Sequence, residues 1–249
     1  MRTVGIIAAR MGSTRLPGKV LLPLAGRPVL WHIIYRLTHA RSVNATIVAT
    51  TNLPRDEPIA DAAAAWDVPC FRGSDHDVLG RHYLAAQRVG ADVIVRVPAD
   101  KPLVDPALVD VVVEAHRRAG ADYTTNMPED WPSGMWFPYG LEVEVVGFHA
   151  LEQAHREATA PADREHGLTY LYQHPEAFRV SRVMTPPDLA HPALRLALDT
   201  REDYELLRHV YALWQEGQPP LDVRRVIAHL TRHPELAAVN RHVRQRGVR

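Results

Sequence analysis

The sequence predicts an α/β fold in which a mostly parallel sheet is covered by helices on both faces. In the first half of the chain, short runs rich in β-branched residues alternate with helical stretches, which is the pattern of parallel strands joined by helices. The strand runs are almost continuously apolar, as expected for strands buried on both faces. The pattern changes after about residue 120, and we expect a small, partly antiparallel insertion there.

The elements of the first half follow from residue type and periodicity. Residues 3–8 form an apolar run suited to a buried strand, and Pro28 is suited to open a helix at residues 28–37, because proline is favoured at the first helical position. The other expected elements are strands at 45–50, 68–71 and 92–97, helices at 56–66 and 78–89, and a helix that starts at Asp105 and Pro106.

The second half is less regular. Residues 130–139 are rich in proline, glycine and aromatic residues and are predicted to form a loop, while residues 141–146 alternate with period two, which favours a half-exposed strand. We further expect helices from Ala150 and Ala162, a strand at 195–198, a helix at 202–214 and, from about 222, a tail of two short helices broken near His233 and Pro234. Residues 1–249 are expected to form one domain with this helical tail.

The bulk composition excludes several classes of protein. Hydrophobic residues make up 46% of the chain, the formal net charge is zero, and basic and acidic residues are interspersed, so we expect neither a nucleic-acid partner nor a membrane partner. The single cysteine, Cys70, excludes an internal disulfide and fits a reducing cytoplasm. We find no signal peptide and no apolar run long enough to span a membrane.

A loop rich in glycine and basic residues follows the first strand. It contains Gly12, Gly18, Arg10, Arg15 and Lys19. In open α/β sheets, ligands bind beyond the carboxyl ends of the strands, and glycine-rich backbone can present its N–H groups to an anion. Lys19 is one of only two lysines among 29 basic residues, and a flexible point charge suits a phosphate contact. The loop therefore predicts a phosphate site.

Two familiar phosphate motifs do not describe this loop. The spacing is not that of the Walker motif, and no G-x-G-x-x-G dinucleotide fingerprint occurs. A solvated basic loop is the alternative interpretation.

Residues 8–21, with the sequence AARMGSTRLPGKVL, resemble the signature loop of the sugar nucleotidyltransferases. More closely, they resemble the cytidylyltransferase family of the spore coat polysaccharide synthesis protein F type, which is related to the 3-deoxy-manno-octulosonate and acylneuraminate cytidylyltransferases. The resemblance extends from residue 3 to about 212. It implies a Rossmann-like fold of the nucleotide-diphospho-sugar transferase type, CTP and Mg²⁺ as ligands, and a homodimer. Further similar segments are 47–51, 71–74, 77–79, 92–106, 140–144, 163–166 and 195–200.

The resemblance implies a set of nucleotide-binding residues, of which Arg10, Lys19 and Asp100 are the expected catalytic ones. Asp77 and Arg81 lie four residues apart, and an ordinary helix pair is the alternative for them. The full expected set is Ala8, Ala9, Arg10, Met11, Gly12, Ser13, Arg15, Lys19, Thr50, Arg72, Gly73, Ser74, Asp77, Ala99 and Asp100.

Two aspartates are the expected metal ligands. Asp100 and Asp199 each end a predicted strand, and Mg²⁺ takes oxygen ligands from one or two carboxylates. In the octulosonate enzymes the aspartates of the matching motifs hold the catalytic metal, so the resemblance assigns this role to Asp100 and Asp199. A cap at the start of the following helix is the alternative for Asp199.

Ala99 and Lys101 depart from the family pattern, which usually has glycine at the first position and cysteine or glutamate at the second. Four roles are open to Lys101: an ion pair with Asp100, a phosphate contact, a contact with an anionic acceptor, or exposure to solvent. These departures also leave an altered or lost activity open.

A third set of residues is expected to bind the acceptor. Glu142 and Glu144 share one face of their predicted strand because side chains alternate, and a solvent-facing pair is the alternative. For Arg164 and His166 the alternative is a polar helix face. The expected set is Lys101, Tyr139, Glu142, Glu144, Arg164 and His166.

The function that the resemblance implies is transfer of CMP from CTP to a sugar acid or related acceptor, with release of pyrophosphate. The alternatives are another nucleotide, another acceptor such as a sugar phosphate, cyclitol or phosphonate, a nucleotide-binding protein with lost catalysis, and a glycosyltransferase of similar architecture.

Overall fold

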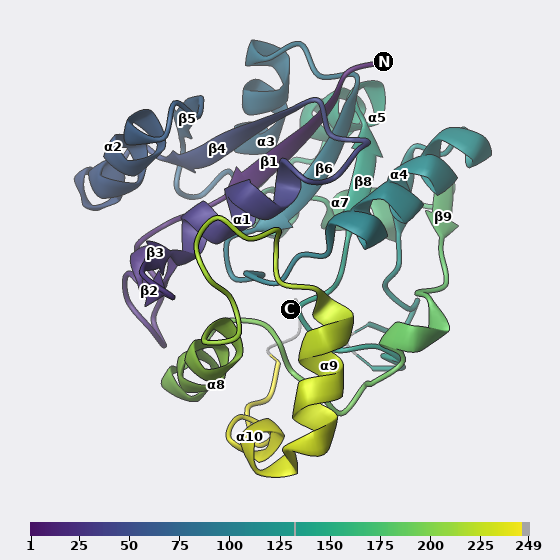
Figure 1. Cartoon of the computed structure of the whole chain (residues 1–249). Coiled ribbons are helices and arrows are strands. Elements are labelled where there is room, and N and C mark those ends of the chain that lie inside the picture. The colour runs from purple at the N-terminus through teal and green to yellow at the C-terminus, as the bar shows by residue number, and fades with distance from the viewer. Residues whose placement is uncertain (132, 246–249) are drawn as a thin grey trace.

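The computed structural model describes residues 1–131 and 133–245, and its centre is one seven-stranded sheet (Figure 1). The strand order is β5-β4-β1-β6-β8-β7-β9. The first four of these pair in parallel, whereas β8 is antiparallel to both β6 and β7. Their bounds are β1 Thr3–Ala8, β4 Ala45–Thr51, β5 Cys70–Gly73, β6 Val93–Pro98, β7 Tyr123–Thr125, β8 Glu144–Gly147 and β9 Val180–Arg182, and a separate hairpin joins β2 Pro23–Leu24 to β3 Arg27–Pro28.

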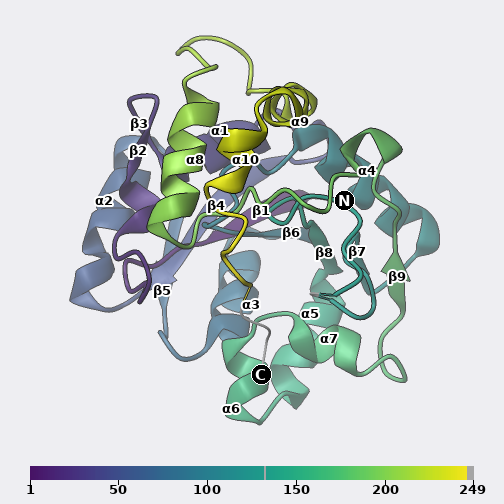
Figure 2. The same ribbon diagram turned by 90° about the horizontal axis from the view of Figure 1, so that it is seen from below.

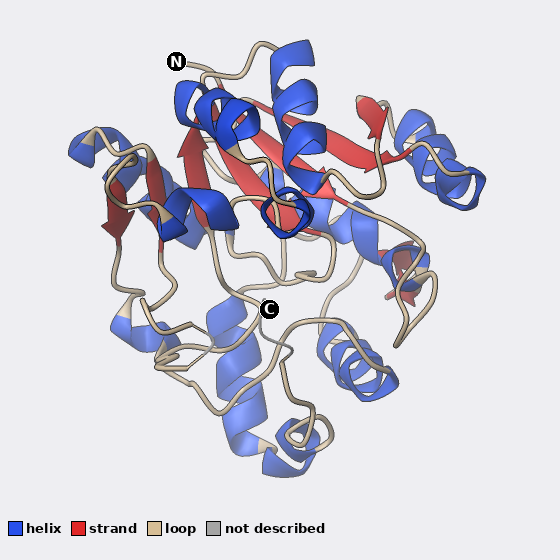
Figure 3. Ribbon diagram, turned by 180° about the vertical axis from the view of Figure 1, so that it is seen from behind, coloured by secondary structure: helices blue, strands red, loops and turns tan. Residues whose placement is uncertain are grey.

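Helices cover both faces of this sheet (Figure 3). Alternate side chains of β6 enter two different clusters of buried residues: Val93 and Val95 pack with helices at 29–37, 106–119 and 201–211, whereas Ile94 packs with helices at 78–88 and 148–157. The predicted α/β fold with helices on both faces is therefore confirmed. The helices are α1 Val29–Leu37, α2 Glu57–Ala65, α3 Val78–Arg88, α4 Pro106–Ala119, α5 Phe148–Glu157, α6 Pro161–Glu165, α7 Thr169–Gln173, α8 Arg201–Tyr211, α9 Val223–Arg232 and α10 Pro234–Ala238.

The C-terminal helices α8, α9 and α10 form a group beside the carboxyl ends of the central strands (Figures 1 and 2). The two short helices of the tail, broken at His233 and Pro234, are confirmed. No helix among the described residues is both long and apolar enough to cross a membrane.

Strand pairing places two loops side by side at this edge of the sheet. Ala8 of β1 lies opposite Pro98 of β6, and the Ala99 N–H donates to the Ala8 carbonyl over 3.0 Å. The chain after β1 and the chain after β6 consequently leave the sheet together, and both contain residues of the predicted site.

Two of the predicted strands are wrong in detail. Residues 141–146 were expected to be half exposed, but all of them are buried, and only Glu144 to Gly147 pair in the sheet. Residues 195–198 form no strand; they have a single bridge to Tyr139. Their backbone instead crosses the edge of the sheet, where Leu198 N–H donates to the Asp100 carbonyl over 2.8 Å.

Gly140 makes this crossing possible. Its φ is 107°, a conformation that favours glycine, and a Cβ at this position would lie 2.6 Å from the Ala197 nitrogen. The apolar pattern of residues 195–198 thus reflects burial under the site rather than membership of the sheet.

His32 predicts a pH dependence of stability. Burial, together with the charges of Arg36 and Arg27, lowers the pKa of His32 from 6.5 to about 4, although the Leu24 carbonyl opposes this. Because the unfolded chain binds the proton near pH 6.5 and the folded protein does not, stability falls as the pH drops below 6.5. Lowering the pH from 7 to 5 should reduce the free energy of unfolding by about 2 kcal/mol through this histidine alone.

The variant His32→Gln, which does not titrate, should remove about 2 kcal/mol of this pH dependence in urea unfolding at pH 7 and 5. The exposed His39 follows the same helix, and His39→Gln is the matched control. Identical pH dependence in the wild type and His32→Gln would contradict the assignment.

Candidate functional site

A cavity of about 280 Å³ opens where β1 and β6 end. It is formed by the loop after β1, the residues that follow β6 and the segment before α8. Its lining residues are Ala8, Arg10, Gly12, Ser13, Thr14, Arg15, Lys19, Val20, Pro98, Ala99, Asp100 and Asp199. We call this the first cavity.

Buried contacts fix the shape of the loop that lines the first cavity. The Met11 N–H donates to Asp56 Oδ1 over 2.6 Å, and the Gly18 N–H closes the loop on the Met11 carbonyl over 3.0 Å. Asp56 is fully buried and also accepts from the Thr51 hydroxyl. Gly18 has a φ of 70°, which explains the glycine at this turn.

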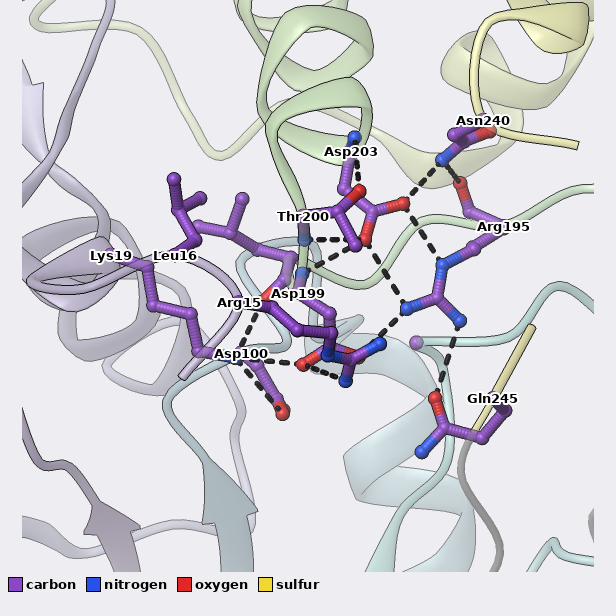
Figure 4. A network of polar contacts seen from close by, with 12 residues as sticks. Arg15, Leu16, Lys19, Asp100, Arg195, Asp199, Thr200, Asp203, Asn240 and Gln245 are labelled. Carbon is purple, nitrogen blue, oxygen red and sulfur yellow. Dashed lines mark hydrogen bonds and ion pairs between the residues drawn. The ribbon is translucent and has the colours of Figure 1, made fainter. Parts of the chain in front are cut away.

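Asp199 is surrounded by three cations (Figure 4). Lys19 Nζ and Arg15 Nη2 lie 2.8 and 3.0 Å from Asp199 Oδ1, and Arg195 Nη2 donates to Oδ2 over 2.7 Å. Burial opposes ionisation of Asp199, but the charges of Lys19, Arg15 and Arg195 outweigh it and lower the pKa of this carboxyl. Lys19 Nζ also donates to the Leu198 carbonyl over 2.6 Å and lies 3.6 Å from Asp100 Oδ2.

A second ion pair holds this group from behind. Asp203 is fully buried and accepts from Arg195 Nε over 2.9 Å and from the Asp199 N–H over 2.9 Å. Asn240, from the tail, donates to Asp203 over 2.8 Å and to the Arg195 carbonyl over 3.0 Å. We call Arg195, Asp203 and Asn240 the Arg195 bracket. The cap of α8 is Thr200, so the alternative that Asp199 caps this helix is wrong.

A second cavity, of about 210 Å³, adjoins the first and shares Pro98 and Asp100 with it. Four of the six predicted acceptor residues line it: Lys101, Tyr139, Glu144 and His166. The other lining residues are Arg96, Pro98, Asp100, Met127, Trp131, Glu165, Thr169 and Tyr172.

Two buried ion pairs stand in the wall of the second cavity. Arg96 Nη1 donates to Glu144 Oε2, and Glu144 Oε1 accepts from the Tyr123 hydroxyl over 2.9 Å. Lys101 Nζ lies 2.9 Å from Glu142 Oε2. The predicted alternatives of a solvent-facing glutamate pair and of a Lys101–Asp100 ion pair are therefore wrong. Burial raises the pKa of the Tyr139 hydroxyl, so this group stays neutral.

The expected nucleotide-binding residues of segment 72–77 line neither cavity. Arg72 donates to the carbonyls of Thr51 and Leu53 and holds the edge strand in place. Asp77 caps α3 and pairs with Arg164 Nη2 over 2.6 Å. Arg81 donates instead to the Ser74 carbonyl over 2.7 Å, so the alternative of an Asp77–Arg81 pair is wrong.

Seven of the expected nucleotide-binding residues thus do not line the first cavity: Ala9, Met11, Thr50, Arg72, Gly73, Ser74 and Asp77. Their assignment stays a prediction, as does that of Arg164 and Glu142 to the acceptor. The sequence analysis gave no role to Arg96, Arg195, Asp203 or Asn240, although Arg96 and Arg195 lie within the segments 92–106 and 195–200 that carry the resemblance.

The two predicted metal ligands differ in their freedom to bind a cation. The Asp100 side chain is 30% exposed, and its one ion pair among the described residues is with Lys19 at 3.6 Å, whereas both oxygens of Asp199 already bind cations. The described residues contain no group of three or more histidine, cysteine or acidic side chains that could hold a metal. Since Mg²⁺ commonly binds through one carboxylate together with substrate phosphates, Asp100 fits the ion, and Asp199 fits it only if its cations move away.

Comparison with known proteins identifies the family of the chain. The family model described as Cytidylyltransferase matches residues 4–240. The chain is 34% identical over 237 residues to the spore coat polysaccharide biosynthesis protein SpsF of Bacillus subtilis, covering 93% of this chain and 95% of that protein. It is 38% identical over 115 residues to a 3-deoxy-manno-octulosonate cytidylyltransferase of Geobacter sulfurreducens, covering 45% and 44%.

A solved structure extends the similarity to the whole fold. A cytidylyltransferase from Leptospira borgpetersenii serovar Hardjo-bovis superposes with a TM-score of 0.86 at 27% identity, covering 99% of this chain and all of that chain (100%).

The Arg195 bracket predicts a large loss of stability on removal of its buried carboxylate. Asp203→Asn should lower the free energy of unfolding by about 2 kcal/mol, because the buried Arg195 loses one of its two carboxylate partners and keeps only Asp199. Glu205→Gln on the same helix removes an exposed carboxylate that pairs with Arg201 and should cost less than about 1 kcal/mol. Equal losses in urea unfolding would contradict a stabilising role for the bracket.

Proposed function

The chain belongs to the cytidylyltransferase family, and we propose that it transfers CMP from CTP to an acceptor hydroxyl with release of pyrophosphate. The observation that carries this proposal is the convergence of Arg10, Arg15 and Lys19 on the first cavity beside Asp100. A cavity lined by three basic side chains at the carboxyl ends of the central strands suits a triphosphate.

The basic residues of the first cavity would hold the β- and γ-phosphates and stabilise departing pyrophosphate. Lys19 and Arg15 already bind a carboxylate oxygen of Asp199 at 2.8 and 3.0 Å, so a phosphate oxygen in the cavity would compete for the same donors. Catalysis would then come from alignment and from neutralising charge on the phosphates. Asp100 would hold Mg²⁺, which supplies Lewis-acid charge at the phosphates when bound.

The acceptor would occupy the second cavity. Because both cavities share Pro98 and Asp100, the α-phosphorus would lie at their junction, within reach of an acceptor oxygen. The new bond joins that oxygen to the α-phosphorus, the bond from the α-phosphorus to the β-phosphate oxygen breaks, and the hydroxyl proton leaves to water.

The acceptor class is the open part of this proposal. The resemblance and the name of the Geobacter sulfurreducens relative support a sugar acid, while a sugar phosphate, a cyclitol, a phosphonate or another nucleotide would use the same chemistry. The homodimer and the cytoplasmic location stay predictions.

Lys19 is expected to contribute directly to the binding of CTP. Lys19→Ala should weaken binding of CTP by about tenfold or more, since a charge-assisted hydrogen bond to phosphate is lost. Isothermal titration with CTP, UTP, ATP and GTP in the presence of Mg²⁺ measures this. The control is Arg41→Ala, which removes an exposed cation outside both cavities. Tight binding of another nucleoside triphosphate in preference to CTP would contradict the proposed donor, and absence of any nucleotide binding would contradict the function.

Asp100 and Asp199 can be separated by their effect on metal dependence. We expect Asp100→Asn to abolish the stimulation of CTP binding by Mg²⁺, because it removes a carboxylate whose one ion pair among the described residues, with Lys19, is long at 3.6 Å. Asp199→Asn should keep that stimulation if Asp199 serves as counter-ion to Lys19 and Arg15. Loss of stimulation in Asp199→Asn alone would show instead that Asp199 is the metal ligand.

A further inference from the structure

A basic side chain that does not line the first cavity packs against the loop that does. We propose that Arg55 is a further nucleotide-binding residue, which joins Arg10 in binding the terminal phosphate of CTP, and that Asp75 holds the two arginines in place until the nucleotide binds. This inference rests on the proposed function and deepens it, because it assigns the residues that distinguish a triphosphate from a shorter nucleotide.

The guanidinium of Arg55 lies directly against Gly12, a residue that lines the first cavity. A Cβ at position 12 would lie 3.1 Å from both Cζ and Nη2 of Arg55, which is closer than an ordinary contact. Gly12 does not have the positive φ of Gly18, so its backbone alone would accept another residue. The missing side chain therefore leaves room for the guanidinium, which stands beside the loop that is expected to bind phosphate.

Asp75 joins Arg55 to Arg10. Arg55 Nη2 donates to Asp75 Oδ2 over 3.1 Å, whereas Arg10 Nη1 lies 3.6 Å from Asp75 Oδ1. The second distance is too long for a hydrogen bond, and Asp75 Oδ1 is buried without a hydrogen-bond partner among the described residues. Arg10 is thus held by charge alone, and a phosphate oxygen that accepts a hydrogen bond would hold it better.

Asp75 keeps an opposite charge beside it when these two arginines turn away. Arg81 is buried and donates to the carbonyl of Ser74, the residue before Asp75, over 2.7 Å. Burial and the charge of Arg10 lower the pKa of Arg81, whereas the charge of Asp75 opposes them. Movement of the two arginines toward a phosphate therefore leaves Asp75 with Arg81 as its counter-charge, so no buried charge is stranded.

The terminal phosphate is the part of CTP that suits Arg10 and Arg55. Lys19 and Arg15 are the more buried basic side chains, at 11% and 24% exposed, while those of Arg10 and Arg55 are 48% and 52% exposed. Lys19 approaches Asp100 to 3.6 Å, and the α-phosphorus is proposed to lie beside Asp100. The triphosphate chain would then extend from the buried pair toward the exposed pair, whose guanidinium groups can bind the terminal phosphate through two oxygens each.

The first test compares nucleotides that differ in the number of phosphates. Isothermal titration with Mg²⁺ measures the affinities of CTP, CDP and CMP for the wild type, Arg55→Gln and Arg55→Lys. We expect Arg55→Gln to weaken binding of CTP by about tenfold, because a charge-assisted hydrogen bond to phosphate is lost, and to leave binding of CMP unchanged. Arg55→Lys keeps the charge and should recover part of the loss.

The matched control for this test is Arg41→Gln. Arg41 is an exposed arginine that pairs with a single aspartate, Asp110, outside both cavities, and its loss should change none of these affinities. Equal weakening of CTP and CMP by Arg55→Gln, or no weakening of CTP, would overturn the inference.

The second test removes the carboxylate that competes with the phosphate. Asp75→Asn keeps the volume of the side chain and removes its charge, so it should strengthen binding of CTP by about threefold or more. The gain should be smaller when Arg55→Gln is also present, because the two residues act on each other. If Asp75 had only a structural role, its loss would loosen the loop and weaken binding, so unchanged or weaker binding of CTP by folded Asp75→Asn would overturn the inference.

A variant of the loop serves if Asp75→Asn does not fold, as judged by circular dichroism. Gly12→Ala places a Cβ against the Arg55 guanidinium and should weaken binding of CTP more than binding of CMP. Addition of Arg55→Gln to Gly12→Ala should then cause little further loss. Fully additive losses would overturn the inference.

The wild-type titration separates this inference from the proposed function. If the wild type binds CTP and Arg55→Gln binds it equally well, only the role of Arg55 is refuted. If the wild type binds no nucleotide, the transferase function is refuted and the role of Arg55 with it.

Discussion

The buried ion pair between Arg195 and Asp203 is the contact on which the geometry of both the site and the C-terminal helices depends. Asp203 accepts from Arg195 and from the Asp199 backbone, and Arg195 in turn holds the Asp199 side chain (Figure 4). Asn240 ties the tail to the same two residues. The helices after residue 200 therefore do more than cover the sheet, because they fix the carboxylate that faces the basic loop.

This arrangement lets the basic loop remain charged without a ligand. Lys19 and Arg15 would repel one another in a half-buried cavity, and Asp199 supplies the counter-charge. A triphosphate would replace that carboxylate with a larger negative charge, so the donors are already assembled where they are needed. The cost is that Asp199 is less available to a metal than Asp100, although the two lie at the same edge of the sheet.

The sequence was sufficient to predict those elements whose structure follows from residue type alone. Strands β1, β4 and β6 are apolar runs buried on both faces, and the loop after β1 could be identified from its residues. It was insufficient for residues 195–198, because an apolar run signals burial but not the partner of its backbone. The Arg195 bracket joins residues up to 45 positions apart, and no periodicity records such a pairing. Strands β7 and β9, of three residues each, are too short to leave a pattern.

Lys19 and Lys101 both lie near Asp100, but their contacts differ. Lys19 contacts Asp199, the Leu198 carbonyl and Asp100 from one ammonium group, which a flexible stem can redirect toward phosphate. Lys101 is locked to a fully buried carboxylate and has lost that freedom. Both lysines therefore carry a counter-ion, but Lys19 faces the first cavity together with two further basic side chains, whereas Lys101 holds the buried Glu142 in place.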